Sequence, residues 1–165
     1  MQQHLAARRG FTLIELVVVI VLLGIVSVYA ASRYTGISSF SSVTTQSEVL
    51  ASLRLTQNRA MQRTDLCNRW LVSNNQAQQV SPSVSAGACT TSLPSTPADS
   101  SFVDAAANDI TLTLTNNDGS HFLDFDSLGR AAQCLTANCT VTLNNLQSGE
   151  SRQVCINSEG YIYAC

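Results

Sequence analysis

The sequence predicts an α+β protein in which one long N-terminal helix carries a small, disulfide-bonded head of antiparallel β-strands. Three observations lead to this prediction. An unbroken apolar run occupies residues 11–31 and contains a single charged residue. A helical spacing of apolar residues continues beyond the run, and no proline occurs before Pro82. Short alternating segments separated by turn residues then fill the C-terminal third, together with four of the six cysteines.

The apolar run is long enough to cross a membrane. Its 21 residues would span about 31 Å as a helix, which is one hydrocarbon thickness. Arg8 and Arg9 come just before it, so the positive-inside rule places the N-terminus in the cytoplasm. All six cysteines lie beyond the run, and an even number confined to one side of a membrane segment indicates an oxidising compartment there. The two arguments use different residues and predict the same orientation.

The helix is expected to continue past the membrane segment. Apolar residues recur there at multiples of three and four positions, with Ser, Thr, Gln and Arg between them: Ile37, Phe40, Val43, Leu50, Leu53, Ala60 and Met61. We therefore predict one helix from about Phe11 to about Asp65, with Gly24 and Gly36 as its weak points. Its second half would place an apolar stripe against a soluble domain.

The head is expected to begin near Asn68. Residues 81–101 contain all three prolines and are predicted to form a long surface loop. Four or five short strands, separated by turn residues, should then form one antiparallel sheet. These predicted strands are Ile110–Thr115, His121–Asp126, Cys139–Leu143, Arg152–Ile156 and Tyr161–Cys165.

Charge and composition weigh against a nucleic-acid binder. Only 12% of the residues are charged, and 58 are Ser, Thr, Asn or Gln. Residues 33–63 carry a net charge of +3, whereas residues 65–165 carry −6. Binding to phosphates requires basic residues on the head, so an acidic head argues against it.

No catalytic motif is present. The sequence lacks a G-x-S-x-G elbow, a phosphate-binding loop and a dinucleotide fingerprint, so we expect no enzymatic activity and no cofactor. His121 lies near Asp118, Asp124 and Asp126, which could suggest a metal site or an acid–base group. The alternative, which we favour, is that Asp118 and Gly119 form a hairpin turn and the aspartates face solvent.

The six cysteines are expected to form structural disulfides. There is no C-x-x-C pair, and no second close pair completes a zinc site beside Cys134 and Cys139. Six cysteines allow 15 connectivities. Proximity along the chain favours three pairs among them: Cys67–Cys89, Cys134–Cys139 and Cys155–Cys165.

The segment RRGFTLIELVVVIVLLGIV resembles the N-terminal signature of type IV pilins and pseudopilins. The resemblance implies that a prepilin peptidase cleaves between Gly10 and Phe11 and that Phe11 becomes N-methylated. It also implies that Glu15 pairs with the N-terminal ammonium of a neighbouring subunit during assembly. The alternative for Glu15 is a shallow position from which its carboxylate reaches the membrane interface.

The resemblance also divides the chain into regions. Residues 1–10 would be the cleaved leader, 11–32 the transmembrane half of the helix, which also forms the filament core, and 33–66 its amphipathic half. Residues 67–165 would form the head. One departure concerns the outer end of the apolar half, where major pilins often have a proline and this sequence has none near Ser32.

The head resembles minor pilins and H-type pseudopilins, in which a strand ends in Phe-x-x-x-Gly-Arg, here Phe125, Gly129 and Arg130. The six cysteines and the closing GYIYAC are most similar to minor pilins of the mannose-sensitive haemagglutinin (MSHA) pilus. This implies a minor pilin that first spans the inner membrane once, with its C-terminus in the periplasm, and then enters a surface filament. Its implied partners are other pilin subunits, the prepilin peptidase and the inner-membrane assembly platform.

Two other functions fit the same residues. The chain could be a minor pseudopilin of a type II secretion system, although six cysteines and a head with few charges favour a surface pilus. In a different class, the head could be a DNA- or carbohydrate-binding module that the filament displays. Adhesion and pilus biogenesis are the roles that the resemblance to MSHA pilins implies.

Overall fold

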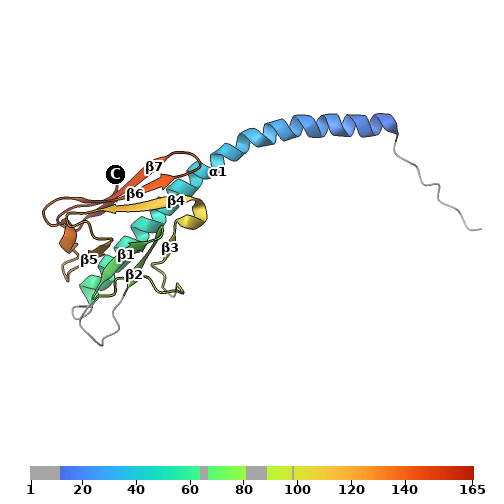
Figure 1. Ribbon diagram of the computed structural model, residues 1–165. Helices are drawn as coiled ribbons and strands as arrows, with labels where there is room; N and C mark the ends of the chain where they lie inside the picture. The colour runs from blue at the N-terminus through green and yellow to red at the C-terminus, as the bar shows by residue number, and fades with distance from the viewer. Residues whose placement is uncertain (1–11, 64–66, 81–88, 98) are drawn as a thin grey trace, which may run out of the picture. The chain divides into compact units, whose positions relative to one another are not determined.

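A long helix and eight short strands make up the computed structural model, which describes residues 12–63, 67–80, 89–97 and 99–165. Helix α1 extends over Leu13–Gln62, close to the predicted range. The chain divides into two compact units, with the boundary after Ile37, so the second half of α1 belongs to the unit that contains the strands. Figure 1 shows this second half running along the sheets.

The head contains two antiparallel sheets rather than the single sheet that the sequence predicted. The first has the order β3-β2-β1-β5 and the second has the order β4-β6-β7-β8. The strands of the first sheet are β1 (Arg69–Ser73), β2 (Gln76–Val80), β3 (Val103–Asp104) and β5 (Phe122–Asp124). Those of the second are β4 (Ile110–Thr115), β6 (Cys139–Asn145), β7 (Ser151–Ile156) and β8 (Ile162–Ala164). Two short 3₁₀ helices, η1 (Ala106–Asn108) and η2 (Ala132–Cys134), lie between strands.

The second sheet agrees closely with the sequence prediction. Strand β4 has the predicted range, and β6, β7 and β8 lie within a few residues of theirs. Alternation is the reason, because Val141 and Leu143 are buried whereas Thr140 and Thr142 between them face outward. The buried face packs on α1, and the two sheets and the helix share one core.

Strands β1 and β2 were missed because their burial does not alternate, and β3 was missed because it has only two residues. The first four residues of β1 are all buried, which requires cover on both faces of the sheet, and β2 buries Gln78 and Gln79. The hairpin between them does have a sequence signal. Asn74 and Asn75 have φ of 52° and 60°, which is the type I′ geometry that asparagine tolerates.

The predicted hairpin at Asp118 and Gly119 is wrong. The segments on either side of it, β4 and β5, pair with different partners, β6 and β1, in different sheets. Asp118 and Gly119 instead belong to the connection that passes from one sheet to the other.

The buried stripe of α1 also differs from the prediction. Leu53 and Ala60 are buried as expected, but Phe40 is 72% exposed and Met61 is 45% exposed. Hydroxyl-bearing residues take part in the buried stripe with Val49, Leu53 and Ala60: Ser42, Thr45, Ser52 and Thr56. Their small size lets the helix lie close to the sheets, and their hydroxyls find partners there or within the helix, as Thr56 does with the carbonyl of Ser52.

Candidate assembly site: the N-terminal helix and the clasp that holds the helix to the head

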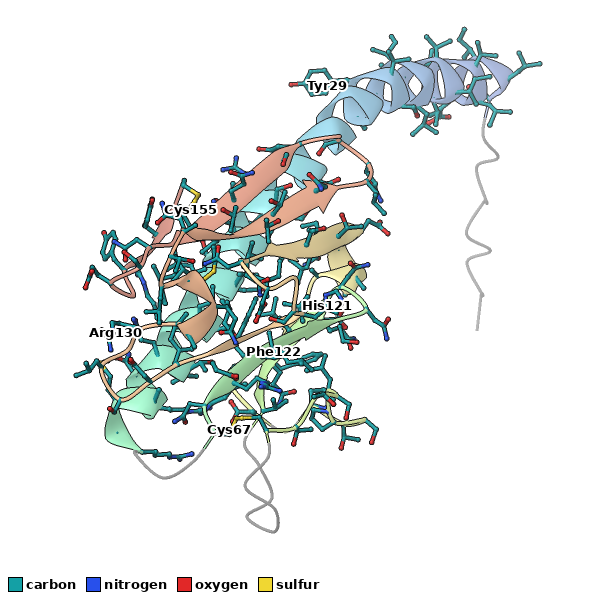
Figure 2. The ribbon with its side chains drawn as sticks, turned by 60° about the vertical axis from the view of Figure 1, so that its left-hand side comes forward. Tyr29, Cys67, His121, Phe122, Arg130 and Cys155 are labelled. Carbon is teal, nitrogen blue, oxygen red and sulfur yellow. A yellow bond between two sulfur atoms is a disulfide. The ribbon has the colours of Figure 1, made fainter. Side chains whose placement is uncertain are left out.

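The first half of α1 exposes almost its whole apolar surface. Residues Leu13–Ala30 have a mean hydropathy of 2.8, and this is the one segment of the described chain that is long and apolar enough to cross a membrane. Its large apolar side chains are between 41% and 81% exposed. In Figure 2 they project from the helix on all sides. Surface of this kind requires a cover, either lipid or other apolar helices.

Glu15 lies in the first turn of this exposed helix, where a carboxylate interacts favourably with the helix dipole. The backbone N–H of Glu15 donates to the hydroxyl of Thr12 at 3.3 Å, so Thr12 caps the helix. This cap was not among the expectations from the sequence, although the pattern Thr-x-x-Glu predicts it. Gly10 and Phe11, the predicted cleavage position, lie outside the described residues.

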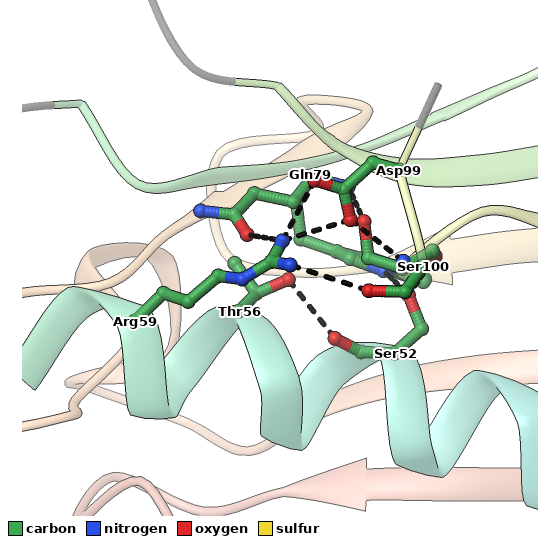
Figure 3. A network of polar contacts seen from close by, with 8 residues as sticks. Ser52, Thr56, Arg59, Gln79, Asp99 and Ser100 are labelled. Atoms are coloured by element: carbon green, nitrogen blue, oxygen red, sulfur yellow. Dashed lines mark hydrogen bonds and ion pairs between the residues drawn. The ribbon is translucent and has the colours of Figure 1, made fainter. Parts of the chain in front are cut away.

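A polar clasp holds the second half of α1 to the loop before β3 (Figure 3). Both carboxylate oxygens of Asp99 accept hydrogen bonds at 2.8 Å from Arg59, whose Nη1 also donates to the Gln79 side chain at 2.6 Å. Partial burial raises the pKa of Asp99, but hydrogen bonds from Arg59 and Ser101 outweigh it, so that the pKa lies below its usual value. The ion pair is therefore formed at neutral pH.

The clasp extends into the core through Ser52. Its hydroxyl donates to the Ser101 carbonyl at 2.5 Å and accepts from the indole N–H of the fully buried Trp70 at 2.9 Å. The Ser101 hydroxyl in turn accepts from the backbone N–H of Gln79. Helix, loop and first sheet are thus joined by a chain of buried hydrogen bonds, in which each loss would leave a polar group unpaired.

A second set of bonds ties α1 to two turns of the head. The Gln57 amide donates to the carbonyls of Gly129 and Gly160 at 2.7 and 2.5 Å, and Arg54 donates to the Ile162 carbonyl at 2.9 Å. Gly160 has φ of 86°, and a Cβ atom there would overlap the Gly129 carbonyl. The Phe125–Gly129–Arg130 motif therefore marks the turn that meets the helix.

The six cysteines are joined in three disulfides in the structure: Cys67–Cys89, Cys134–Cys139 and Cys155–Cys165. These are the pairs that proximity along the chain favours. Cys67, Cys89 and Asp124 place three possible ligand atoms within 4.8 Å of one another. They do not form a metal site here, since the sulfurs are bonded to each other and Arg69 binds both oxygens of Asp124 at 2.7 Å.

His121, which Figure 2 labels, is exposed and lines a pocket together with Asn74, Asn75 and Leu112. The four ion pairs seen among the described residues all join an arginine to a carboxylate, so none holds His121 in an acid–base arrangement. Of the aspartates near it in sequence, Asp124 pairs with Arg69 and Asp126 with Arg130. The side chains of these two remain 30% and 39% exposed, and Asp118 is exposed.

The exposed apolar helix, its capped acidic first turn and the two-sheet head together have a type IV pilin-like fold. A family model described as the prokaryotic N-terminal methylation motif matches residues 5–31.

Among solved structures, the crystal structure of the type IV minor pilin FimU of Pseudomonas aeruginosa is similar to this chain, with a TM-score of 0.53 and 14% sequence identity. The match covers 75% of this chain and 87% of FimU. A search of curated protein sequences finds no significant match.

Proposed function

We propose that the chain is a minor type IV pilin that is cleaved between Gly10 and Phe11, methylated at Phe11 and assembled into a surface pilus of the MSHA type. One observation carries the proposal. The first half of α1 is an apolar helix that nothing in the described chain covers. The same helix continues into a second half that a polar clasp holds to a head cross-linked by three disulfides. A subunit of this kind moves from lipid, which covers the helix first, to a filament core, where neighbouring helices cover it.

The proposed partners follow from this transfer. Prepilin peptidase would act at the cytoplasmic end of the helix, the assembly platform would extract the subunit from the inner membrane, and other pilins would pack around residues 11–32. The head, residues 67–165, would remain in the periplasm until assembly. Glu15 would pair with the N-terminal ammonium of the adjacent subunit, because a carboxylate in an apolar core is costly unless it has a partner.

A type II pseudopilin is the main competing function. The three disulfides and the low charge of the head suit a surface exposed to variable conditions, which favours a pilus. Deletion of the gene in its own host separates the two. A pilus subunit should be recovered with sheared surface filaments, and its loss should reduce piliation while leaving protein secretion unchanged.

The matched variant is Gly10→Val. It should be inserted in the inner membrane but keep its leader and stay out of the filament fraction. The control is Gln3→Val, elsewhere in the predicted leader, which should be cleaved and assembled as wild type. A secretion defect without loss of filaments would contradict the proposal and support the pseudopilin alternative.

A further inference from the structure

The outer face of the second sheet is an uncharged surface dominated by hydroxyl groups. On each strand the inward residues are mostly buried and the outward ones are exposed or half-buried. We call the outward set the hydroxyl face: Thr111, Thr113, Thr115, Thr140, Thr142, Asn144, Ser151, Gln153, Cys155 and Tyr163. Six of the ten are threonine or serine, and none is charged.

The strand register arranges these side chains in rows. Thr113 lies opposite Thr142, which lies opposite Gln153. A parallel row runs through Thr115, Thr140, Cys155 and Tyr163. A third joins Thr111, Asn144 and Ser151. Successive rows lie about 6.7 Å apart along the strands, and neighbouring side chains within a row lie about 4.8 Å apart. The result is a regular grid of polar groups.

The hydroxyls of this grid have capacity for an outside partner. Within the described residues, those of Thr113 and Thr115 make no hydrogen bond, and the bonds on the rest of the face are long. The Gln153 amide lies 3.5 Å from the Thr142 hydroxyl, and the Thr111 hydroxyl lies 3.4 Å from the Asn144 carbonyl. A threonine hydroxyl both donates and accepts, as sugar hydroxyls do, so the two kinds of group complement each other.

An aromatic pair borders the grid. The rings of Tyr161 and Tyr163 stack with centroids 5.4 Å apart, and Tyr161 is 63% exposed. An exposed, rigid ring of this kind offers an apolar surface for the C–H face of a pyranose, with a hydroxyl at its tip. Tyr163 lies in the same row as Thr140 and Cys155, so a chain that crosses the strands can reach ring and hydroxyls together.

We propose that the hydroxyl face binds an extended, neutral polysaccharide. The hydroxyl face carries no charged residue, which excludes a nucleic acid or another polyanion as its ligand, because such ligands require cationic side chains. A protein partner would favour an apolar centre, whereas this face has threonine there. A grid that extends over three rows and four strands offers contacts to a long chain rather than to a single sugar. The proposal concerns the isolated chain and stands whether or not the chain enters a pilus.

Retention on insoluble glycans tests this inference. The full chain, purified in a detergent without a sugar headgroup, is mixed with cellulose, chitin or starch granules, and with polystyrene beads as the control matrix. We expect retention on at least one of the neutral glycans, with little loss in high salt, because no charges take part. Cellulose and starch differ in the linkage between the same sugars, whereas cellulose and chitin differ in the sugar at the same linkage, so the comparison separates the two properties.

The test variant is Thr113→Val with Thr142→Val, which preserves shape and strand propensity but removes two central hydroxyls. It should lower the affinity about tenfold or more, since two hydrogen bonds are lost. Tyr161→Ala should have a similar effect, and it keeps the test decisive if the double variant unfolds. The control is Thr44→Val, whose hydroxyl lies on α1 and bonds to the Phe40 carbonyl. It should bind as wild type.

Three results would overturn the proposal. The chain could fail to bind any of the neutral glycans, or the folded double variant could bind them as well as wild type. Alternatively, the face could mediate self-association, which would appear as a concentration-dependent dimer that the double variant abolishes while glycan retention is unaffected.

Discussion

Glu15 stands at a position where two physical effects meet. As the third residue of a helix capped by Thr12, its carboxylate is favourable near the helix N-terminus by about 0.3–1 kcal/mol. As a charge within an apolar segment, it costs about 2.5–3.5 kcal/mol on insertion scales. The local gain does not offset the cost, which is the reason to expect a partner outside the chain.

Glu15→Ala should therefore separate insertion from assembly. The variant should insert and be cleaved normally, because it removes a charge from the apolar segment. It should be depleted from filaments, since the proposed partner ammonium would lose its counter-charge, at a cost of about 3–5 kcal/mol for a buried pair. The measurement is the ratio of the chain in sheared filaments to that in the inner membrane. Glu15→Asp keeps the charge and should partly restore assembly, and wild-type recovery of Glu15→Ala would refute the pairing.

Asp99 makes a pH-dependent contribution to stability. Its pKa in the folded protein lies below its usual value of 3.8, so the charged form is stabilised by folding. That stabilisation is complete above the pKa of the unfolded chain and is lost as the pH falls through the lower, folded pKa.

Asp99→Asn should consequently lower the free energy of unfolding at neutral pH by about 1–2 kcal/mol. The difference from wild type should shrink between about pH 5 and pH 2. Denaturant unfolding across this range measures it. Asp126 also has a lowered pKa, from hydrogen bonds with Arg130 that outweigh burial, so the comparison must be made between variant and wild type at each pH. A difference that stays constant with pH would show that the Asp99 charge is not involved.

At the scale of single elements, a strand could be predicted from the sequence where apolar and polar residues alternate along it and turn residues bound it. Strand β6 follows directly from the sequence, because Val141 and Leu143 alternate with threonines. Strand β2 could not be predicted in this way, since its buried residues include Gln78 and Gln79 and burial on both faces removes the period of two. Partners far along the chain, such as Ser101 for Gln79, determine whether a buried glutamine-rich strand is acceptable.

In the candidate site too, some features follow from local sequence patterns and others depend on residues far along the chain. The apolar segment and its acidic first turn are local patterns that a sequence reveals. The clasp joins Arg59 to Asp99 and Ser52 to Ser101, pairs separated by 40 and 49 residues. Nothing local to either partner indicates the other, and the buried serines and threonines of α1 conceal its packing stripe.

Gly149 and Gly160 lie in neighbouring hairpins and provide a matched test of the contact between the turn at Gly160 and the turn at Gly129. Gly149 and Gly160 both have positive φ, 70° and 86°, but only Gly160 lacks room for a Cβ atom. Gly149→Ala should cost about 1–2 kcal/mol, the price of the left-handed conformation alone. Gly160→Ala should cost clearly more, because its methyl group would collide with the Gly129 carbonyl. Equal losses in thermal unfolding would show that the two turns do not meet.

The disulfides should stabilise the head by restricting the unfolded chain. The Cys67–Cys89 bond closes a separation of 22 residues, for which the chain-entropy model gives about 3 kcal/mol. We expect Cys67→Ser with Cys89→Ser to lower the stability by this order. Peptide mapping without reductant should recover the three pairs seen in the structure. Any other linkage, or free thiols in the folded protein, would contradict them.

For the whole molecule, the central feature is the contrast between apolar residues buried in the head and apolar residues exposed on the first half of α1. The head buries its apolar residues around Val49, Leu53 and Trp70, whereas Leu13–Ala30 expose theirs. A subunit with this division is incomplete alone, and its function follows from what covers the exposed half. Lipid before assembly and neighbouring pilin helices afterwards would satisfy both stages, and neither requires chemistry from the chain itself.

The mass of the N-terminal peptide in sheared, purified filaments tests this account most directly. The account predicts that the chain is present there and begins at Phe11 with one added methyl group, whereas the membrane fraction of a peptidase-deficient strain contains the intact leader. Filaments that lack the chain, or a chain that keeps residues 1–10 or begins beyond Ala31, would contradict it.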